Sequence, residues 1–196
     1  KNLYDEKYDK GSFIKNIILD NILPSDIYIK SKELHFNADV MRIVFLIKFF
    51  GKSDVIPFDM VQNMFPDKNK DFVININETD IALIKQLQEG TESKELYKIA
   101  EQVENALKNE LGLKVVVGVG TIVGHIRELA RAYKEAGVAI DVGKVFDTEK
   151  TVINYENLGI GRLIYQLPTI LCQMFLQEVF KKNPIDALDQ DRKSVV

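Results

Sequence analysis

The feature that most constrains the fold is the order in which two apolar patterns follow one another between residues 41 and 155. Short apolar runs indicate strands, whereas apolar residues three and four positions apart indicate helices. This reading predicts strands at 41–49, 71–76, 80–87, 113–119 and 151–155. Between them it predicts helices at 54–65, 92–111 and about 124–140. Gly112 is a natural C-terminal cap for the second of these helices.

The polar turn Asn77-Glu78-Thr79 separates the second and third strands and predicts an antiparallel hairpin. The resulting order is β-α-β-β-α-β, followed by a further helix and strand. This is the split βαβ, or ferredoxin-like, arrangement with an addition at its end. We therefore expect an α+β fold with a mostly antiparallel sheet and with its helices on one face.

Helical segments flank this unit on both sides. A helix at 10–23 ends at Pro24 and Ser25, which are predicted to cap a second short helix. The last helix covers roughly 160–181, and Pro168 is expected to bend or split it. We thus divide the chain into a helical lead-in at 1–38, an α/β domain at 39–155 and a C-terminal helix within 156–196.

The apolar stripe of that last helix is broader than one helix face requires. Two interpretations remain open: the whole stripe packs inside the domain, or part of it meets a second copy of the chain. The stripe contains Leu163, Ile164, Leu167, Ile170, Leu171, Met174, Phe175, Leu176 and Val179.

Composition excludes several classes of protein. The chain has 196 residues, 46% of them hydrophobic, and a formal net charge of −3, so no general basic field attracts nucleic acid or an anionic membrane. No apolar run is long enough to span a bilayer, and no signal peptide is present, which favours a cytoplasmic location. The single cysteine, Cys172, allows no internal disulfide and is interpreted as a buried, inert thiol.

The stretch VVVGVGTIVGHI at 115–126 raises the question of a dinucleotide-binding loop, because glycines there would let the backbone approach a pyrophosphate. Such a loop belongs to the first strand-to-helix turn of a parallel sheet, however, and here a hairpin precedes it. We therefore interpret Gly118 and Gly120 as positions where a strand packs closely against a helix or bends, and we expect no cofactor.

Neither histidine has the partners that a metal site requires. His35 follows a helix and His125 begins one, so capping or surface roles are expected for both. Arg127, Arg131 and Lys134 form a basic helix face, but Glu128 and Glu135 lie among them. Such a face could contact phosphate or an acidic partner, but the mixture of charges favours a solvated face.

Two motifs carry a resemblance to a known family. The first, VVVGVGTIVGHIRELARAYKEAGVAIDVGKVF at 115–146, joins a strand, Gly-x-Gly and a helix that contains Tyr133, Glu135 and Ala136. The second is YENLGIGRLIYQLP at 155–168. With the helical opening at 8–36, they resemble the GGDEF-like central domain and lead-in of the carbohydrate diacid regulators (CdaR/PucR type), which are transcription factors.

This resemblance makes catalysis a question, since diguanylate cyclases of the same fold bind GTP and Mg²⁺. Those enzymes need an aspartate on the first strand, where this chain has Ile47 and Lys48. They also need a Gly-Gly-Asp/Glu-Glu-Phe hairpin, where this chain has INETDIA, with Glu78 and Asp80 but no glycine. Asp54 lies beyond the strand and is expected to cap a helix. We predict no catalytic, cofactor-binding or metal-binding residue.

The resemblance implies a non-catalytic regulatory and dimerisation module of a bacterial transcriptional regulator. It would relay effector sensing to a C-terminal helix-turn-helix domain, absent from this chain, that binds DNA. The chain is accordingly expected to be part of a longer protein that acts as a homodimer. The alternative is a degenerate GGDEF-fold domain that binds a nucleotide or senses a small molecule.

Overall fold

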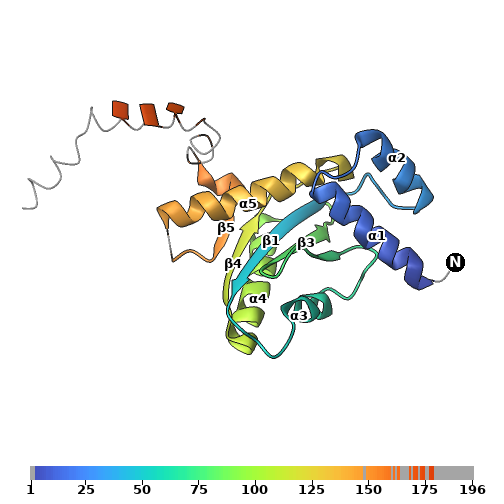
Figure 1. Cartoon of the computed structure of the whole chain (residues 1–196), viewed down its shortest axis with the longest axis horizontal. Helices are drawn as coiled ribbons and strands as arrows, with labels where there is room; N and C mark the ends of the chain where they lie inside the picture. Colours follow the sequence, from blue (N-terminus) through green and yellow to red (C-terminus); the bar gives the residue numbers. More distant parts are fainter. Residues whose placement is uncertain are drawn as a thin grey trace, which may run out of the picture. The chain divides into compact units, whose positions relative to one another are not determined.

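The computed structural model describes residues 3–147, 149–159, 161, 163, 168, 170, 171, 173, 174, 177 and 178, with side chains from residue 10 onward except that of residue 146. It divides into two compact units, Lys1–Leu158 and Gly159–Val196. The first unit contains the sheet and the helices labelled in Figure 1. In the second, Leu163 and Ile170 are helical and Pro168 is not, which agrees with the predicted interruption.

The first unit is built on a mixed five-stranded sheet. Its strands are β1 (Arg42–Phe50), β2 (Phe72–Asn75), β3 (Asp80–Gln86), β4 (Lys114–Val119) and β5 (Val152–Asn154), in the spatial order β2-β3-β1-β4-β5. All neighbours are antiparallel except β4 and β5, which are parallel. This confirms the α+β fold and the predicted hairpin, which is formed by β2 and β3.

Helices cover both faces of the sheet, so the prediction of helices on one face is wrong. Figure 1 shows α3 (Pro57–Met64) and α4 (Ser93–Leu111) on one side and α1 (Leu3–Ile18) and α5 (Leu129–Phe146) on the other. The reason lies in β1, where Ile43, Phe45 and Ile47 pack towards α4 while Val44 and Leu46 face α1 and α5. A strand that is apolar on both faces needs cover on both.

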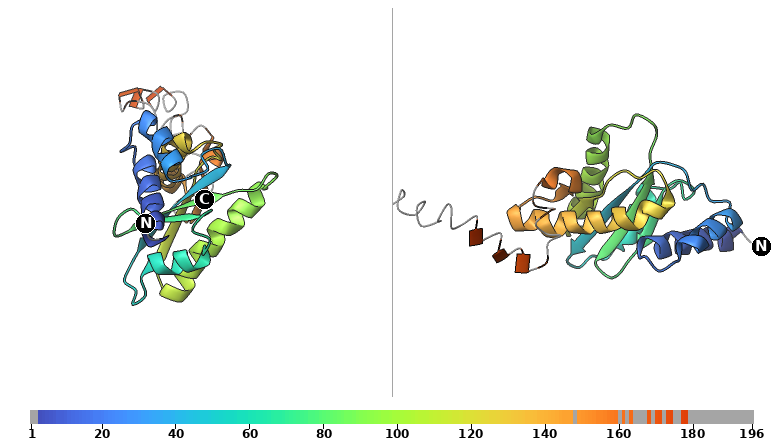
Figure 2. Two further views of the ribbon diagram at one scale, coloured as in Figure 1. Left: turned by 90° about the vertical axis from the view of Figure 1, so that its right-hand side faces the viewer. Right: turned by 90° about the horizontal axis from the view of Figure 1, so that it is seen from above.

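The lead-in packs on the sheet as part of the first unit. Phe13, Ile14, Ile17 and Ile18 of α1 are buried against the face that Val44 belongs to. Figure 2 shows α1 and α2 (Pro24–Glu33) side by side. Ser25 does not cap α2 as predicted, because Leu23 is the N-cap residue and Pro24 is the first helical residue. Proline suits this position, where a backbone N–H would lack a partner.

The ends of the later helices follow local chemistry. Gly112 ends α4 in the left-handed conformation, with φ of 66°, as predicted for its C-cap. Before α5, His125 caps the short 3₁₀ turn η1 (Ile126–Glu128) by accepting a hydrogen bond from the backbone N–H of Arg127. The carboxylate of Glu128 accepts in return from the backbone N–H groups of Gly124 and His125. This reciprocal pattern is a capping box.

The glycines of the VVVGVG stretch allow α5 to lie directly on β4, as the sequence interpretation predicted. A Cβ atom added at Gly120 would lie 2.5 Å from the carbonyl oxygen of Ala132, and one at Gly118 would lie closer still to that of Ala136. Both neighbours are helix backbone, which cannot rotate aside as a side chain can. Gly124, by contrast, has open space around it.

Replacing Gly118 by alanine will therefore force α5 away from the sheet. We expect Gly118→Ala to lower the free energy of unfolding by about 2–3 kcal/mol in urea denaturation, the cost of overpacking a rigid core. Gly124→Ala is the matched control and should change the free energy of unfolding by less than about 0.5 kcal/mol. Equal effects of the two substitutions would contradict the close contact.

Candidate functional site

Three segments meet at one end of the sheet: the C-terminal end of β1, the turn between β2 and β3, and the turn between α4 and β4. They surround an open hollow of about 720 Å³, here called the hairpin hollow. Its lining includes Lys52, Asp54, Glu78 and Glu110. Lys48 and the hairpin INETDIA, considered above as positions for metal and nucleotide ligands, belong to this end of the sheet.

The β2–β3 turn is held by its own side chains. The Oδ1 atom of Asn77 accepts hydrogen bonds from the backbone N–H and the hydroxyl of Thr79, at 2.9 and 3.1 Å. The backbone N–H of Ile76 donates to the carbonyl of Asp80 at 3.0 Å and closes the turn. Asn and Thr supply these local bonds without glycine. The turn therefore presents the exposed side chain of Glu78 instead of a bare backbone.

The acid that begins β3 is paired with a lysine on β1. Lys48 and Asp80 are cross-strand neighbours, and the Lys48 ammonium lies 3.2 Å from an Asp80 carboxylate oxygen. The other Asp80 oxygen accepts from the Thr79 hydroxyl at 2.9 Å. The Asp80 side chain is only 10% exposed. A carboxylate at this depth needs such partners, because a buried charge without them is costly.

Tyr133 of α5 adds to the environment of this ion pair. Burial, and secondarily the negative charge of Asp80, raise the pKa of the Tyr133 hydroxyl. The phenol therefore stays protonated at neutral pH and carries no negative charge into the region. Lys48 is thus the cation that balances Asp80.

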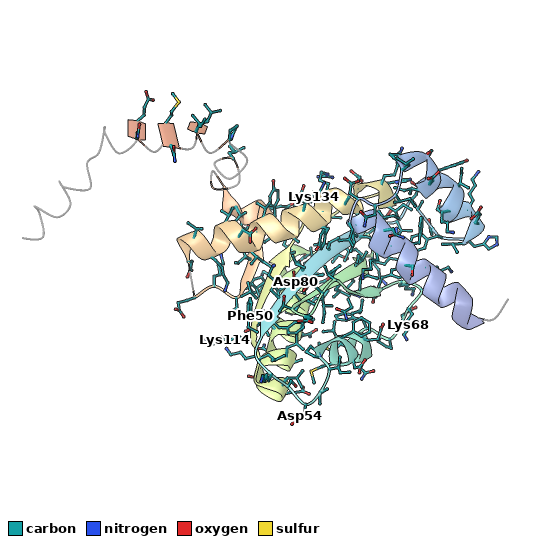
Figure 3. All side chains as sticks on the ribbon, in the orientation of Figure 1. Phe50, Asp54, Lys68, Asp80, Lys114 and Lys134 are labelled. Carbon is teal, nitrogen blue, oxygen red and sulfur yellow. The ribbon has the colours of Figure 1, made fainter. Side chains whose placement is uncertain are left out.

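The other acids of the hairpin hollow are dispersed. Figure 3 shows Asp54 on the loop before α3, apart from Asp80. Asp54 does not cap α3 as predicted: Ile56 is the N-cap residue and Pro57 begins the helix. Within residues 3–159, apart from the uncertain positions, no three His, Cys, Asp or Glu side chains form a group that could hold a metal ion.

The opposite end of the sheet has a second hollow, of about 750 Å³, between α2, the segment 35–39 and the turn before α5. It brings together His35 and His125, which the sequence analysis treated separately. As expected, both have terminal positions: His125 caps η1, and His35 follows the end of α2. We call this space the α2 hollow.

Two of the three cations on the basic helix face are paired with carboxylates. The Arg131 guanidinium lies 3.1 Å from carboxylate oxygens of both Glu128 and Glu135. Lys134 lies 3.4 Å from Asp20, in the linker between α1 and α2. The Glu135 carboxylate also accepts hydrogen bonds from the backbone N–H and hydroxyl of Thr121. These pairs leave Arg127 as the member of this face that lines the α2 hollow.

Two sequence interpretations fall largely outside the described residues. Cys172 lies there, as do Ile164, Leu167, Phe175, Leu176 and Val179 of the broad apolar stripe. Within the described helices, none is long and apolar enough to cross a membrane.

Comparison with known proteins agrees with the observed topology. The GGDEF-like domain profile matches residues 20–142, from the α1–α2 linker into α5. Because this match spans more than half of the chain, the chain belongs to the GGDEF-like domain family. No curated protein matches it.

The Lys48–Asp80 ion pair was missed in the sequence analysis, although each residue was singled out. The signal was a lysine among the apolar residues of RIVFLIKFF, because a carboxylate directly opposite on the next strand stabilises such a cation. The partner follows only from the strand register, which a sequence of this kind does not give by itself.

Removing the lysine will leave the Asp80 carboxylate without its counter-charge. We expect Lys48→Met to lower the free energy of unfolding by about 1–3 kcal/mol, measured by urea denaturation at pH 7. Lys48→Met combined with Asp80→Asn should recover part of this loss. The control is Lys70→Met, which removes an exposed ion pair with Asp67 and should cost less than about 1 kcal/mol. Similar losses for both single variants would contradict a partly buried, required pair.

The Glu128 cap predicts a dependence on pH. Burial raises the pKa of Glu128, but bonds from the backbone of Gly124 and His125 and from Arg131 outweigh it and lower that pKa below its usual 4.5. Its stabilising contribution is therefore present above pH 4.5 and disappears as the pH falls through the lowered pKa.

Wild type should exceed Glu128→Gln in free energy of unfolding by about 0.5 kcal/mol at pH 7, because the side chain is partly exposed. The difference should vanish in acid, as followed by denaturation at several pH values. Glu89→Gln, an exposed change before α4, provides the control. A difference between wild type and Glu128→Gln that does not vary with pH would refute the charged cap.

Proposed function

We propose that this chain is a non-catalytic regulatory module of a bacterial transcriptional regulator of the CdaR/PucR type. It would pass an effector signal to a C-terminal helix-turn-helix domain that binds DNA. Membership of the GGDEF-like family supports the central part of this proposal. The motifs at 115–146 and 155–168, together with the helical lead-in, support the finer assignment.

The observation that carries the proposal is the Lys48–Asp80 pair. In the cyclases that share this fold, a first-strand aspartate holds Mg²⁺, and such a hard cation prefers carboxylate oxygens. Here the first strand offers an ammonium group 3.2 Å from the hairpin acid. A fixed positive charge at this place repels a divalent cation and already satisfies the carboxylate. The hairpin INETDIA also lacks the glycines that admit a nucleotide.

The proposed mechanism is mechanical. The lead-in helix α1 packs against β2 and α5. A displacement of α1 would therefore change the packing of the core side chains between the sheet and these helices. Two arrangements of helices around a rigid sheet would bias the geometry of a homodimer and hence of its DNA-binding domains. In this scheme apolar side chains of the lead-in and last helices transmit the change of packing.

The hairpin hollow favours one alternative, a degenerate nucleotide-binding domain. Its volume of about 720 Å³ and the presence of Lys52 in its lining would suit a phosphate-bearing ligand. The acids Asp54, Glu78 and Glu110 in the same lining oppose this, because they repel phosphate. A nucleotide would need a bridging cation that the Lys48–Asp80 pair disfavours.

Isothermal titration with GTP and Mg²⁺ tests the proposal, with light scattering on the same sample. We expect no heat of binding, no diguanylate product, and a mass of twice one chain. Micromolar binding of GTP would overturn the relay and favour the nucleotide-binding alternative. A purely monomeric chain would refute the dimerisation part of the proposal.

The dimer contact can be tested in the last helix. Leu171→Asp and Met174→Asp should convert the dimer to monomers in light scattering, since burying a charge between chains is unfavourable. Gln173→Asp introduces the same charge at a polar position between them and should leave the dimer intact. Dissociation by all three variants would point to general disruption of the segment instead of a specific apolar contact.

A further inference from the structure

The α2 hollow has the composition of a binding site. The described residues that line it combine two aromatic side chains, Tyr28 and Phe36, with four basic ones. We call the latter the basic rim: Lys32, His35, His125 and Arg127. Asp39 is the one acidic residue among the described lining residues, and its side chain is 85% exposed. The charged side chains of this lining are therefore two cations, Lys32 and Arg127, and one exposed carboxylate.

Both lead-in helices end with a non-glycine residue in the left-handed conformation, Asp20 after α1 and His35 after α2. His35 has φ of 49°, in the left-handed region, and α2 ends there in a Schellman motif. The backbone N–H of His35 donates to the carbonyl of Lys32, and that of Phe36 donates to the carbonyl of Ser31. Glycine is the usual residue at this position, because a side chain there strains the backbone. The chain instead places an imidazole in the hollow.

A buried cation lies behind the segment 35–39. Arg42 is 2% exposed, and its guanidinium donates to the carbonyl groups of Asn37, at 2.7 Å, and Val40, at 3.5 Å. Its Nε atom is buried without a hydrogen-bond partner. Throughout the described part of the chain, no carboxylate lies within ion-pair distance of Arg42. Burial lowers its pKa to about 10, so it remains charged at neutral pH.

The positive charge of Arg42 lies next to residues that line the hollow. The guanidinium lies 4.9 Å from the centre of the Phe36 ring, and Phe36 and Asn37 line the hollow. In a region of low dielectric constant an uncompensated cation raises the electrostatic potential around it more than it would in water. An anion bound in the hollow would supply the missing counter-charge.

The side chain of His125 is already oriented for an anion. Its Nδ1 atom accepts from the backbone N–H of Arg127 at 3.0 Å and from Arg127 Nε at 3.3 Å. The neutral imidazole must therefore carry its proton on Nε2. That nitrogen lies 3.6 Å from a carboxylate oxygen of Asp39. The chain's own carboxylate, which is largely exposed, is thus close to the donor.

We propose that the α2 hollow binds a small organic anion, a carboxylate or phosphate on an apolar or aromatic body. The basic rim binds the charged group, Tyr28 and Phe36 contact the body, and Asp39 gives way to the ligand. The volume of about 750 Å³ admits a molecule larger than an inorganic ion. This inference rests on the hollow alone and does not depend on the proposed function.

The first test is an NMR titration of the intact chain with phenyl phosphate, benzoate and benzyl alcohol. We expect saturable shifts in residues of the α2 hollow with at least one of the two anions, and none with the neutral alcohol. Phenyl phosphate alone would identify a phosphate site, and benzoate alone a carboxylate site. The affinity should fall as salt is added, because the rim is exposed to solvent. No saturable shift with either anion, or equal shifts with benzyl alcohol, would overturn the proposal.

Variants separate binding from folding. Arg127→Ala should weaken anion binding five- to tenfold, whereas Lys68→Ala, which removes a lysine outside the hollow, should leave it unchanged. Asp39→Asn removes the competing carboxylate and should strengthen binding two- to fivefold. His35→Gly relieves the backbone and should raise the melting temperature while weakening binding. If His35→Gly and Arg127→Ala both bind as wild type does, the basic rim is not the site.

Discussion

The structure depends on one strand that is buried on both faces and paired along both edges. β1 lies between β3 and β4, and its residues from Ile43 to Ile47 contact helices on either side of the sheet. Removing such a run of side chains from water provides much of the stabilisation of a small domain. Each layer of the first unit is held in place by its contact with this strand or with its neighbours.

The two ends of this apolar run are marked by cations whose surroundings differ. Lys48 faces a carboxylate on the next strand, and its charge is balanced within the protein. Arg42 is bonded to backbone carbonyl groups, which carry only partial charges. The cation at the hairpin end is therefore paired with a carboxylate, whereas among the described residues no carboxylate lies within ion-pair distance of Arg42.

Much of the fold could be predicted from the sequence because the apolar periodicity is clear. The strands, the hairpin and the helix end at Gly112 all follow from local signals. The helix caps at Asp54 and Ser25 were wrong, since a proline one or more residues away begins each helix with no side-chain cap. The one-face prediction failed although RIVFLIKFF already showed apolar residues on both sides.

The candidate sites were harder to predict because they depend on contacts between distant segments. Lys48 and Asp80 were each noticed, but only the strand register pairs them. His35 and His125 are far apart in sequence and meet because β1 and the turn after β4 bring their loops together through the bridge between Arg42 and Val123. The spacing of the two histidines along the chain does not predict that they line the same hollow.

The seat of α5 on β4 limits how the domain can move. Val116, Gly118 and Gly120 share one face of the strand, and only the two glycines leave room for the helix backbone. If α5 slid along β4, a helix carbonyl would run into the side chain of Val116, so translation along the strand is blocked. The helix can then change its position against the sheet only by tilting about this contact. A displacement of the turn before α5 would therefore rotate the helix. The resulting shift of the helix axis would be largest at its far end, near Phe146.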